Sequence, residues 1–379
     1  MRITIDYTPA LRQSAGIGRY TRGLIGALAA LDRQNQYTLF CAGQAPGAGP
    51  TDGASWPPNF RVRVVPWQAR HLSIAWHRLQ LPLPAEWLAG PTDLFHSPDF
   101  TLPPLARARG VVTVHDLSFL TVPECADPRL RAFLERAVPG AVRRARRVLA
   151  DSASTANDLN RLLGVPAEKI SVVPAGIEPR FEPVRDPACL ARVRARYRLP
   201  ERFILGLGTL EPRKNFVRLI QAYAELQRRA PLPQNLVIAG GPGWLYEGIY
   251  AEARRQAAPE RICFPGFVAD EDLPALYTLA DAFAFPSLYE GFGIPPLEAM
   301  ACGTPVICAN NSSLPEAVGD AALLVDATDV GGLAGGLLGL LGDGALRARL
   351  VTAGLARAGR FTWSDAAAGL LAAYRQTML

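Results

Sequence analysis

Short runs of β-branched and aromatic residues alternate with helical stretches along nearly the whole chain, and this alternation most constrains the fold. Such a rhythm is typical of βαβ units, which build parallel sheets. In the first half we predict strands at residues 3–6, 37–41, 62–65, 94–96, 111–115, 148–150 and 171–173. In the second half we predict strands at residues 203–207, 236–239, 262–264, 282–285, 306–308 and 322–325.

Helices fit between these strands. They are predicted at residues 18–31, 128–147, 152–163, 215–229, 244–257, 270–280, 296–301, 332–341 and 364–377. Asp151 and Ser152 are expected to cap the third of them. Three prolines and a glycine between Pro174 and Pro183 indicate a linker.

The 379 residues suit two domains. We expect an acceptor-side domain at residues 1–178, with the helix at 364–377 packing back on it, and a nucleotide-sugar-binding domain at 179–363. Both are expected to be doubly wound, Rossmann-like α/β domains, with the ligand site in a cleft between them.

Several classes of protein are excluded by what the sequence lacks. No uncharged apolar run reaches the roughly 18 residues of a membrane span, and Met1–Asp6 looks like a strand and not a signal peptide. The six cysteines are scattered without a C-x-x-C pair, which argues against a disulfide framework or a zinc site. We therefore expect a protein of the reducing cytoplasm.

Two glycine-containing loops precede predicted helices and suit a phosphate. Gly16 and Gly18 follow the first strand, although Thr21 stands where a dinucleotide fingerprint needs its third glycine, so a Rossmann dehydrogenase is disfavoured. Arg213 and Lys214 follow the strand at 203–207. Cations at a helix start are unfavourable unless an anion joins them, so we interpret this pair as a diphosphate site.

Carboxylates and a histidine follow other strands. Glu290 and Glu298 are eight residues apart around Gly291 and Gly293, a pattern that suits anionic or hydroxyl-rich ligands, although Glu298 alone could be a helix cap. His115 ends the strand at 111–115 and is a candidate for catalysis.

Four further acidic residues lie next to predicted strands or helices. Asp99 follows the strand at 94–96 and Asp116 follows His115, so both are acceptor-side candidates. Asp270 and Asp272 spell the D-x-D of metal-dependent sugar transferases, but they precede a helix, and we interpret them as caps. We predict no metal and no cofactor.

The order of these motifs resembles glycosyltransferase family 4, a group of retaining enzymes with the GT-B fold. The specific matches are Gly206–Asn215 and Tyr289–Pro305, the latter resembling the family's E-x7-E element. The resemblance covers essentially the whole chain, and its wording is most similar to bacterial polysaccharide mannosyltransferases. It implies a nucleotide-sugar donor, with GDP-mannose first and UDP-glucose behind it.

The resemblance also implies roles for individual residues. Catalysis would fall to His115, Arg213, Lys214 and Glu290, with Arg213 and Lys214 on the diphosphate. The donor would be bound by Gly16, Gly18, Thr209, Phe267, Val268, Gly291, Phe292, Gly293 and Glu298, with Phe267 and Val268 beside the base and Glu298 on the ribose. Tyr20, Asp99 and Asp116 would face the acceptor.

Two mechanisms of retention stay open at this point. Glu290 could act as a covalent nucleophile, or the donor phosphate could take the acceptor proton in a front-face route, which we favour. The alternatives to a transferase are a GT-B nucleotide-sugar epimerase and a catalytically silent nucleotide-sugar-binding subunit.

The net charge of +6 belongs to the first half, where residues 1–178 hold 20 Lys and Arg against 14 Asp and Glu. The predicted helix with Arg129–Arg147 is the most basic stretch. It is either an ordinary solvated helix or a face for anionic lipid beside a glycan or lipid-linked acceptor. Nucleic acid is not expected, because no binding motif accompanies the charge. A peripheral position on the inner face of the membrane would follow.

Overall fold

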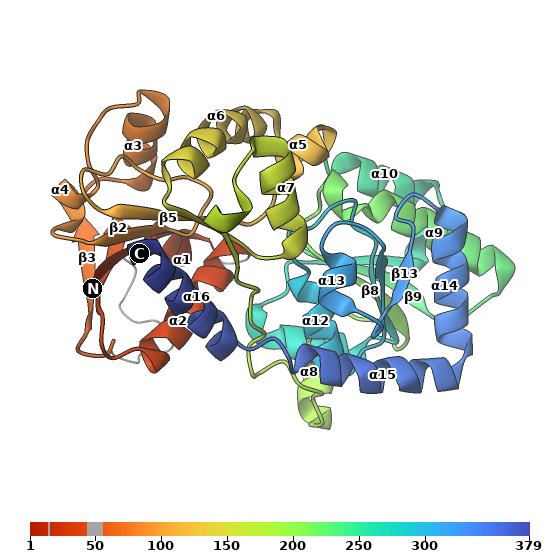
Figure 1. The fold of residues 1–379 in the computed structure, drawn as a ribbon. Coiled ribbons are helices and arrows are strands. Elements are labelled where there is room, and N and C mark those ends of the chain that lie inside the picture. Colours follow the sequence, from red (N-terminus) through yellow and green to blue (C-terminus); the bar gives the residue numbers. More distant parts are fainter. Residues whose placement is uncertain (14–15, 44–55) are drawn as a thin grey trace. The chain divides into compact units, whose positions relative to one another are not determined.

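The computed structural model describes residues 1–13, 16–43 and 56–379, which fold into two compact units (Figure 1). The first unit comprises Met1–Leu117, Ala132–Gly176 and Phe361–Leu379. The second comprises Ser118–Arg131 and Ile177–Arg360. The segment Ser118–Arg131 thus groups with the second unit, whereas the sequence alone places it in the first domain. One reason is a hydrogen bond from the Trp244 indole nitrogen to the Cys125 carbonyl oxygen, 2.7 Å long.

A seven-stranded parallel sheet forms the centre of the first unit. Its strands are β1 (Arg2–Asp6), β2 (Gln36–Ala42), β3 (Phe60–Val65), β4 (Leu94–Ser97), β5 (Arg109–Val114), β6 (Arg147–Ala150) and β7 (Ile170–Val172). Their spatial order is β3-β2-β1-β4-β5-β6-β7. The order reverses between β1 and β4, as in doubly wound folds.

The helices of this region cover both faces of the sheet, and Figure 1 shows α6 on one side with α2 and α16 on the other. They are α1 (Thr8–Arg12), α2 (Ile17–Leu31), α3 (Ala69–Ser73), the π-helix η1 (Ile74–Arg78), α4 (Glu86–Ala89), α6 (Pro128–Arg144), α7 (Ala153–Leu163), the 3-10 turn η3 (Ala167–Lys169) and α16 (Trp363–Met378). The last helix is anchored by its Tyr374 hydroxyl, 2.7 Å from His96 Nδ1.

A six-stranded parallel sheet forms the second unit. Its strands are β8 (Phe203–Leu207), β9 (Asn235–Ala239), β10 (Ile262–Gly266), β11 (Ala282–Phe285), β12 (Val306–Ala309) and β13 (Leu323–Val325), in the order β10-β9-β8-β11-β12-β13. Side chains alternate along β11: Ala282 and Ala284 belong to a core shared with α9 and α14, whereas Phe283 packs on Tyr277 of α11. Both faces are therefore buried under helices.

The helices around this sheet are α5 (Ser118–Thr121), η2 (Pro123–Cys125), α8 (Pro187–Arg196), η4 (Pro212–Lys214), α9 (Phe216–Arg229), α10 (Glu247–Arg255), η5 (Pro259–Arg261), η6 (Asp270–Asp272), α11 (Leu273–Leu279), α12 (Ile294–Ala301), α13 (Leu314–Val318), α14 (Val330–Gly342) and α15 (Gly344–Ala358). The η labels here denote 3-10 turns. In the part of the chain that the structure describes, no helix combines the length and apolar character needed to cross a bilayer.

Candidate active site

The loops that follow β8 and β11 meet at the point where the strand order of the second sheet reverses. In open parallel sheets, ligands bind at the carboxyl ends of the strands at such a switch point. The backbone N–H of Leu288, in the loop after β11, donates to the carbonyl oxygen of Arg213, in the loop after β8, at 2.8 Å. The two motifs singled out in the sequence are therefore joined directly.

Four charged side chains form a cluster at this switch point. Lys214 Nζ lies 2.7 Å from one carboxylate oxygen of Glu290, and an Arg213 guanidinium nitrogen lies 2.8 Å from the other. Arg213 also donates to Glu211 at 2.7 Å. Two cations and two carboxylates thus alternate, and Glu290 is only 8% exposed. We call Glu211, Arg213, Lys214 and Glu290 the charged cluster.

Glu211 and Glu290 supply the anions that the cations near this helix start require, so the helix-start argument does not by itself call for a ligand, and the diphosphate stays a prediction. Burial opposes ionisation of Glu290, but the Arg213 and Lys214 charges outweigh it and lower its pKa to about 2. Glu290 is therefore a carboxylate at neutral pH. Glu211, which is buried, is a member that sequence reasoning missed. Its position two residues before Arg213 was the available signal.

The backbone around Glu290 is held by hydroxyl groups. The Ser312 hydroxyl accepts a hydrogen bond from the Glu290 N–H at 3.0 Å, and the Ser313 hydroxyl lies 2.8 Å from the Glu290 carbonyl oxygen and 2.7 Å from that of Phe292. Gly293 has a φ of 127°, which favours glycine. The loop is thus shaped by contacts that fix where Glu290 points.

The remaining predicted donor residues lie in several environments. Glu298 is buried in α12, where it accepts a hydrogen bond from the Tyr277 hydroxyl at 3.0 Å. Phe267 is 58% exposed while the neighbouring Val268 is buried. Thr209 is exposed in the loop after β8. The triplet Gly291–Gly293 is buried in the loop before α12.

In the first unit, His115 lies just past β5 with both ring nitrogens bonded. Its Nδ1 is 2.7 Å from Asp151 Oδ2, and its Nε2 is 2.8 Å from the carbonyl oxygen of Pro98. Since a carbonyl oxygen only accepts, Nε2 must donate, and an ionised Asp151 requires a donor at Nδ1 as well. Burial opposes the charge, but Asp151 and then Asp99 raise the pKa of His115 to about 9. Burial also raises the pKa of Asp151, and the direct contact between the two groups favours the imidazolium form of His115 paired with the carboxylate form of Asp151.

Asp151 is not the helix cap that the sequence suggested. Ser152 caps α7 by accepting a hydrogen bond from the N–H of Thr155, while the Asp151 carboxylate turns to His115. Because this partner lies 36 residues earlier in the chain, a local capping rule could not find it. Asp151 is the main functional candidate that sequence reasoning missed in this unit.

Other acceptor-side candidates lie near His115. Asp99 accepts a hydrogen bond from the Gln13 side chain at 3.1 Å, and burial raises its pKa. Asp6, at the end of β1, is half-buried, and its removal from water raises its pKa to about 6. The Tyr20 ring is buried 4.9 Å from the His115 ring, and Asp116 is half-buried. Tyr20 therefore packs against His115.

Gly16 is the N-cap of α2 and Gly18 lies in its first turn, and a glycine is favoured at each for a different reason. Gly16 has a φ of 52° and open space at its Cβ position. A side chain at Gly18 would collide with the Gln13 backbone, at 1.8 Å from its carbonyl oxygen. Gly18 thus permits a close backbone approach within the first unit. Their predicted approach to a phosphate stays a prediction.

Asp272 does not cap α11, which corrects the predicted cap. Its buried carboxylate accepts hydrogen bonds from Arg192 at 2.9 Å, Arg196 at 2.7 Å and the Tyr197 hydroxyl at 2.9 Å. It therefore ties α8 to α11. In the described ranges, no group of three or more His, Cys, Asp or Glu side chains could hold a metal ion.

Two family models match the chain in succession. "Glycosyltransferase Family 4" matches residues 14–181 and "Glycosyl transferases group 1" matches residues 192–357. Among solved structures, sucrose-phosphate synthase from Thermosynechococcus elongatus superposes with a TM-score of 0.76 at 22% identity. It covers 100% of this chain and 99% of that one, a likeness that establishes the fold.

Curated relatives agree with these models. The O-antigen chain mannosyltransferase B of Escherichia coli is 33% identical over 382 residues, covering 99% of this chain and 100% of that protein. The GDP-mannose-dependent alpha-(1-6)-phosphatidylinositol monomannoside mannosyltransferase of Mycolicibacterium smegmatis is 36% identical over 200 residues, 50% of this chain and 51% of that protein. The chain belongs to glycosyltransferase family 4 and is a glycosyltransferase with the GT-B fold.

Proposed function

We propose that this glycosyltransferase moves mannose from GDP-mannose to a glycan or lipid-linked acceptor of polysaccharide assembly, with retention of configuration. The observation that carries the proposal is the charged cluster at the switch point of the second sheet. Arg213 offers a planar fork for two phosphate oxygens, and Lys214 offers a compact charge beside it. Together they match a diphosphate.

The choice of donor is supported by the relatives. The protein matched over its full length is a mannosyltransferase, and another relative is named as GDP-mannose-dependent. The exposed ring of Phe267 offers a face on which a purine base can stack. UDP-glucose is the second candidate, because a few pocket contacts decide between donors.

The chemistry follows from where charge develops. As the bond between the sugar C1 and the diphosphate oxygen breaks, negative charge builds on the leaving phosphate, which Arg213 and Lys214 stabilise. The acceptor hydroxyl oxygen bonds to C1 from the same face and passes its proton to the leaving phosphate oxygen. Glu290 is tied to two cations through both oxygens, which makes it a weak nucleophile and supports this front-face route.

The first unit would contribute His115 on the acceptor side. Held by Asp151 and the Pro98 carbonyl, its imidazolium is a fixed positive charge and a poor general base. We propose that it stabilises charge on the transferred sugar or the acceptor and does not remove the acceptor proton. The front-face route needs no such base.

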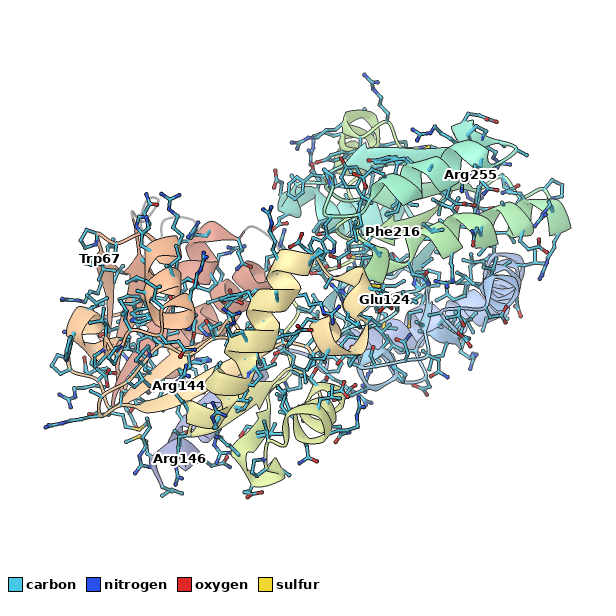
Figure 2. The ribbon with its side chains drawn as sticks, turned by 90° about the horizontal axis from the view of Figure 1, so that it is seen from above. Trp67, Glu124, Arg144, Arg146, Phe216 and Arg255 are labelled. Atoms are coloured by element: carbon cyan, nitrogen blue, oxygen red, sulfur yellow. The ribbon has the colours of Figure 1, made fainter. Side chains whose placement is uncertain are left out.

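We also propose a peripheral place at the inner face of the membrane, with the basic helix α6 toward anionic lipid. Arg136 and Arg143 are exposed on this helix. Figure 2 shows Arg144 and Arg146 near its C-terminal end. Arg144 also donates to the Leu102 carbonyl oxygen at 2.6 Å, so part of the basic charge is used inside the protein.

A thermal-shift panel of nucleotides and nucleotide-sugars tests the donor. GDP and GDP-mannose should raise the melting temperature most, and UDP-glucose less. Donor hydrolysis with and without lipid extract, in the presence of EDTA, then tests turnover and the need for a metal. If no nucleoside diphosphate stabilises the protein, the donor site is wrong, and stabilisation without turnover would favour a silent binding subunit.

The mechanism is tested at Glu290. Mass spectrometry of the quenched reaction should find no sugar attached to this residue. A trapped glycosyl-enzyme on Glu290 would refute the front-face route. In Glu290→Gln, the competing negative charge on Arg213 and Lys214 is removed. GDP binding should therefore hold or strengthen while transfer falls. Loss of both would point to a collapsed loop, which the melting temperature would reveal.

A further inference from the structure

Large apolar side chains are unusually exposed in one stretch of the first unit, residues 61–87, which we call the apolar–basic segment. Trp87 is 70% exposed and Trp67 is 52% exposed. Val62, Val64, Leu79 and Leu81 are also exposed. Figure 2 shows Trp67 at the edge of the first unit. Soluble domains rarely expose large apolar patches unless these meet a partner.

The same stretch is positively charged. It holds the exposed Arg61, Arg63, Arg70 and Arg78 against a single acidic residue, Glu86. One carboxylate oxygen of Glu86 accepts hydrogen bonds from the backbone N–H groups of residues 106–108 at 2.9 to 3.0 Å, so this carboxylate holds the loop before β5. The segment therefore combines exposed tryptophans and aliphatic chains with a surplus of arginine.

Part of this surface is an edge of the sheet. β3 is the outer strand, and its four central residues are exposed, with Arg61 and Arg63 alternating with Val62 and Val64. Charged residues on an edge strand discourage pairing with a strand of a second copy. A partner that contacts both arginine and aliphatic side chains therefore suits this edge better than a second copy of the strand does.

The segment adjoins the basic helix α6. The ring of His77, in η1, lies 6.2 Å from that of Phe133 in α6. In the described part of α6, Leu130 is the exposed large apolar side chain, whereas the apolar–basic segment carries several. The helix alone offers charge, and the neighbouring segment adds the apolar groups that insertion into a lipid surface requires.

We propose that the apolar–basic segment docks on an anionic phospholipid bilayer, beside α6. Trp67 and Trp87 would sit at the level of the headgroups, as aromatic side chains do at membrane interfaces. The arginines would meet lipid phosphates, and the aliphatic side chains would be removed from water. This deepens the lipid-linked acceptor of the proposed function and rests on it for its purpose, although not for the binding itself.

Vesicle co-sedimentation of the full chain tests the proposal. Vesicles of equal phosphatidylglycerol and phosphatidylcholine should carry down the protein in 0.1 M salt, and pure phosphatidylcholine vesicles should carry down much less. The double variant Trp67→Ser/Trp87→Ser should lower the partition coefficient by roughly tenfold or more. The matched control is Leu245→Ser, an equally exposed apolar residue of the second unit, which should bind like the parent protein.

Other outcomes separate the alternatives. Arg61→Gln/Arg63→Gln should weaken binding at low salt and matter less at high salt. Failure of the parent protein to bind anionic vesicles, or equal binding by the tryptophan variant, would overturn the proposal. A dimer in light scattering that disappears in the tryptophan variant would overturn it in favour of a second copy. GDP stabilisation measured without vesicles should be equal in all variants, so failure of the donor model would show separately.

Discussion

Lys214 packs its side-chain stem against Gly208, in the loop after β8, and its ammonium group contacts Glu290. The ammonium lies 4.8 Å from the centre of the Phe285 ring, and a Cβ on Gly208 would lie 3.2 Å from the lysine Cε. The lysine side chain thus runs close to Gly208 and the Phe285 ring. We predict that the bulkier guanidinium of an arginine would crowd these neighbours, so charge alone should not replace the lysine.

We therefore predict that Lys214→Ala lowers kcat/KM for the donor by roughly 100-fold or more, because a charge aimed at the leaving phosphate is lost. Lys214→Arg should recover only part of this loss. Lys169, the other lysine of the chain, is the matched control, since its Nζ donates to the Arg143 carbonyl oxygen on the surface of the first unit. Steady-state kinetics decide the matter. Full activity in Lys214→Arg would show that any cation suffices.

His115 links the stability of the first unit to pH. Its folded pKa, about 9, lies above the ordinary value of 6.5, so the stabilisation is complete below pH 6.5 and is lost as pH rises through 9. The shift corresponds to an upper bound of about 3 kcal/mol. In Asp151→Asn this loss between pH 6.5 and 9 should largely disappear, although the variant is less stable throughout.

The measurement is denaturant unfolding at several pH values, combined with nitrogen-detected NMR of the imidazole. Asp99 also raises the His115 pKa, and the Tyr20 ring packs on the imidazole, so Asp99→Asn serves as the comparison and should lower the His115 pKa less. An unchanged His115 pKa in Asp151→Asn would refute the assignment of Asp151 as the positioning residue.

At the residue scale, motifs in the sequence predicted a phosphate site at Arg213 and Lys214 and a contact with sugar hydroxyls at Glu290, and the structure brings these three side chains together. Sequence reasoning could not tell that Glu290 bonds both cations, since these partners lie more than 70 residues apart. Asp151 was misassigned for the same reason. Capping rules consider only the residues around a helix start, whereas the contact of Asp151 with His115 joins residues that are far apart in the chain.

At the level of elements, the packing of α2 on α16 depends on one glycine. A Cβ at Gly23 would lie 2.3 Å from the Trp363 ring, whereas Gly26, one turn further along the same helix, has nothing within 4 Å. Gly23→Ala should destabilise the first unit by about 1–3 kcal/mol through overpacking. Gly26→Ala should be neutral or stabilise by up to about 1 kcal/mol, since alanine favours a helix.

Hydrogen exchange across α16 should report this pair of variants directly. Amides of α16 should exchange faster in Gly23→Ala and no faster in Gly26→Ala, while those of β8 and β11 stay unchanged in both. If both variants behave alike, Gly23 is not needed for the docking of α16.

All thirteen described strands fall where the alternation of residues predicts them, because buried parallel strands have a strong local signature. Helix ends were less predictable. The predicted helix at 128–147 ends at Arg144, and the helix predicted at 244–257 spans only Glu247–Arg255. Helices α8 and α15 lie outside the predicted elements, although Asp186 and Asp343 cap them. Their exposed, Ala- and Arg-rich faces give a weak apolar pattern.

For the whole molecule, the two sheets have the same order of their first six strands, but different candidate site residues lie in each unit. The charged cluster lies entirely in the second unit, and His115 with Asp151 lies in the first. The alternation of strands and helices predicted both sheets. The place of Ser118–Arg131 in the second unit depends on contacts such as that of Trp244 with Cys125, and no local pattern encodes such contacts.

This division predicts that GDP stabilises one unit selectively. In differential scanning calorimetry, GDP at 100 times its Kd should stabilise the second unit by about 2.7 kcal/mol. The unfolding temperature of the first unit should not change. Gly23→Ala identifies which transition belongs to the first unit, because its strain lies wholly there. The same ligand shift should survive in this variant. A GDP shift confined to the Gly23-sensitive transition would place the diphosphate on the first unit, and the assignment of Arg213 and Lys214 would then fail.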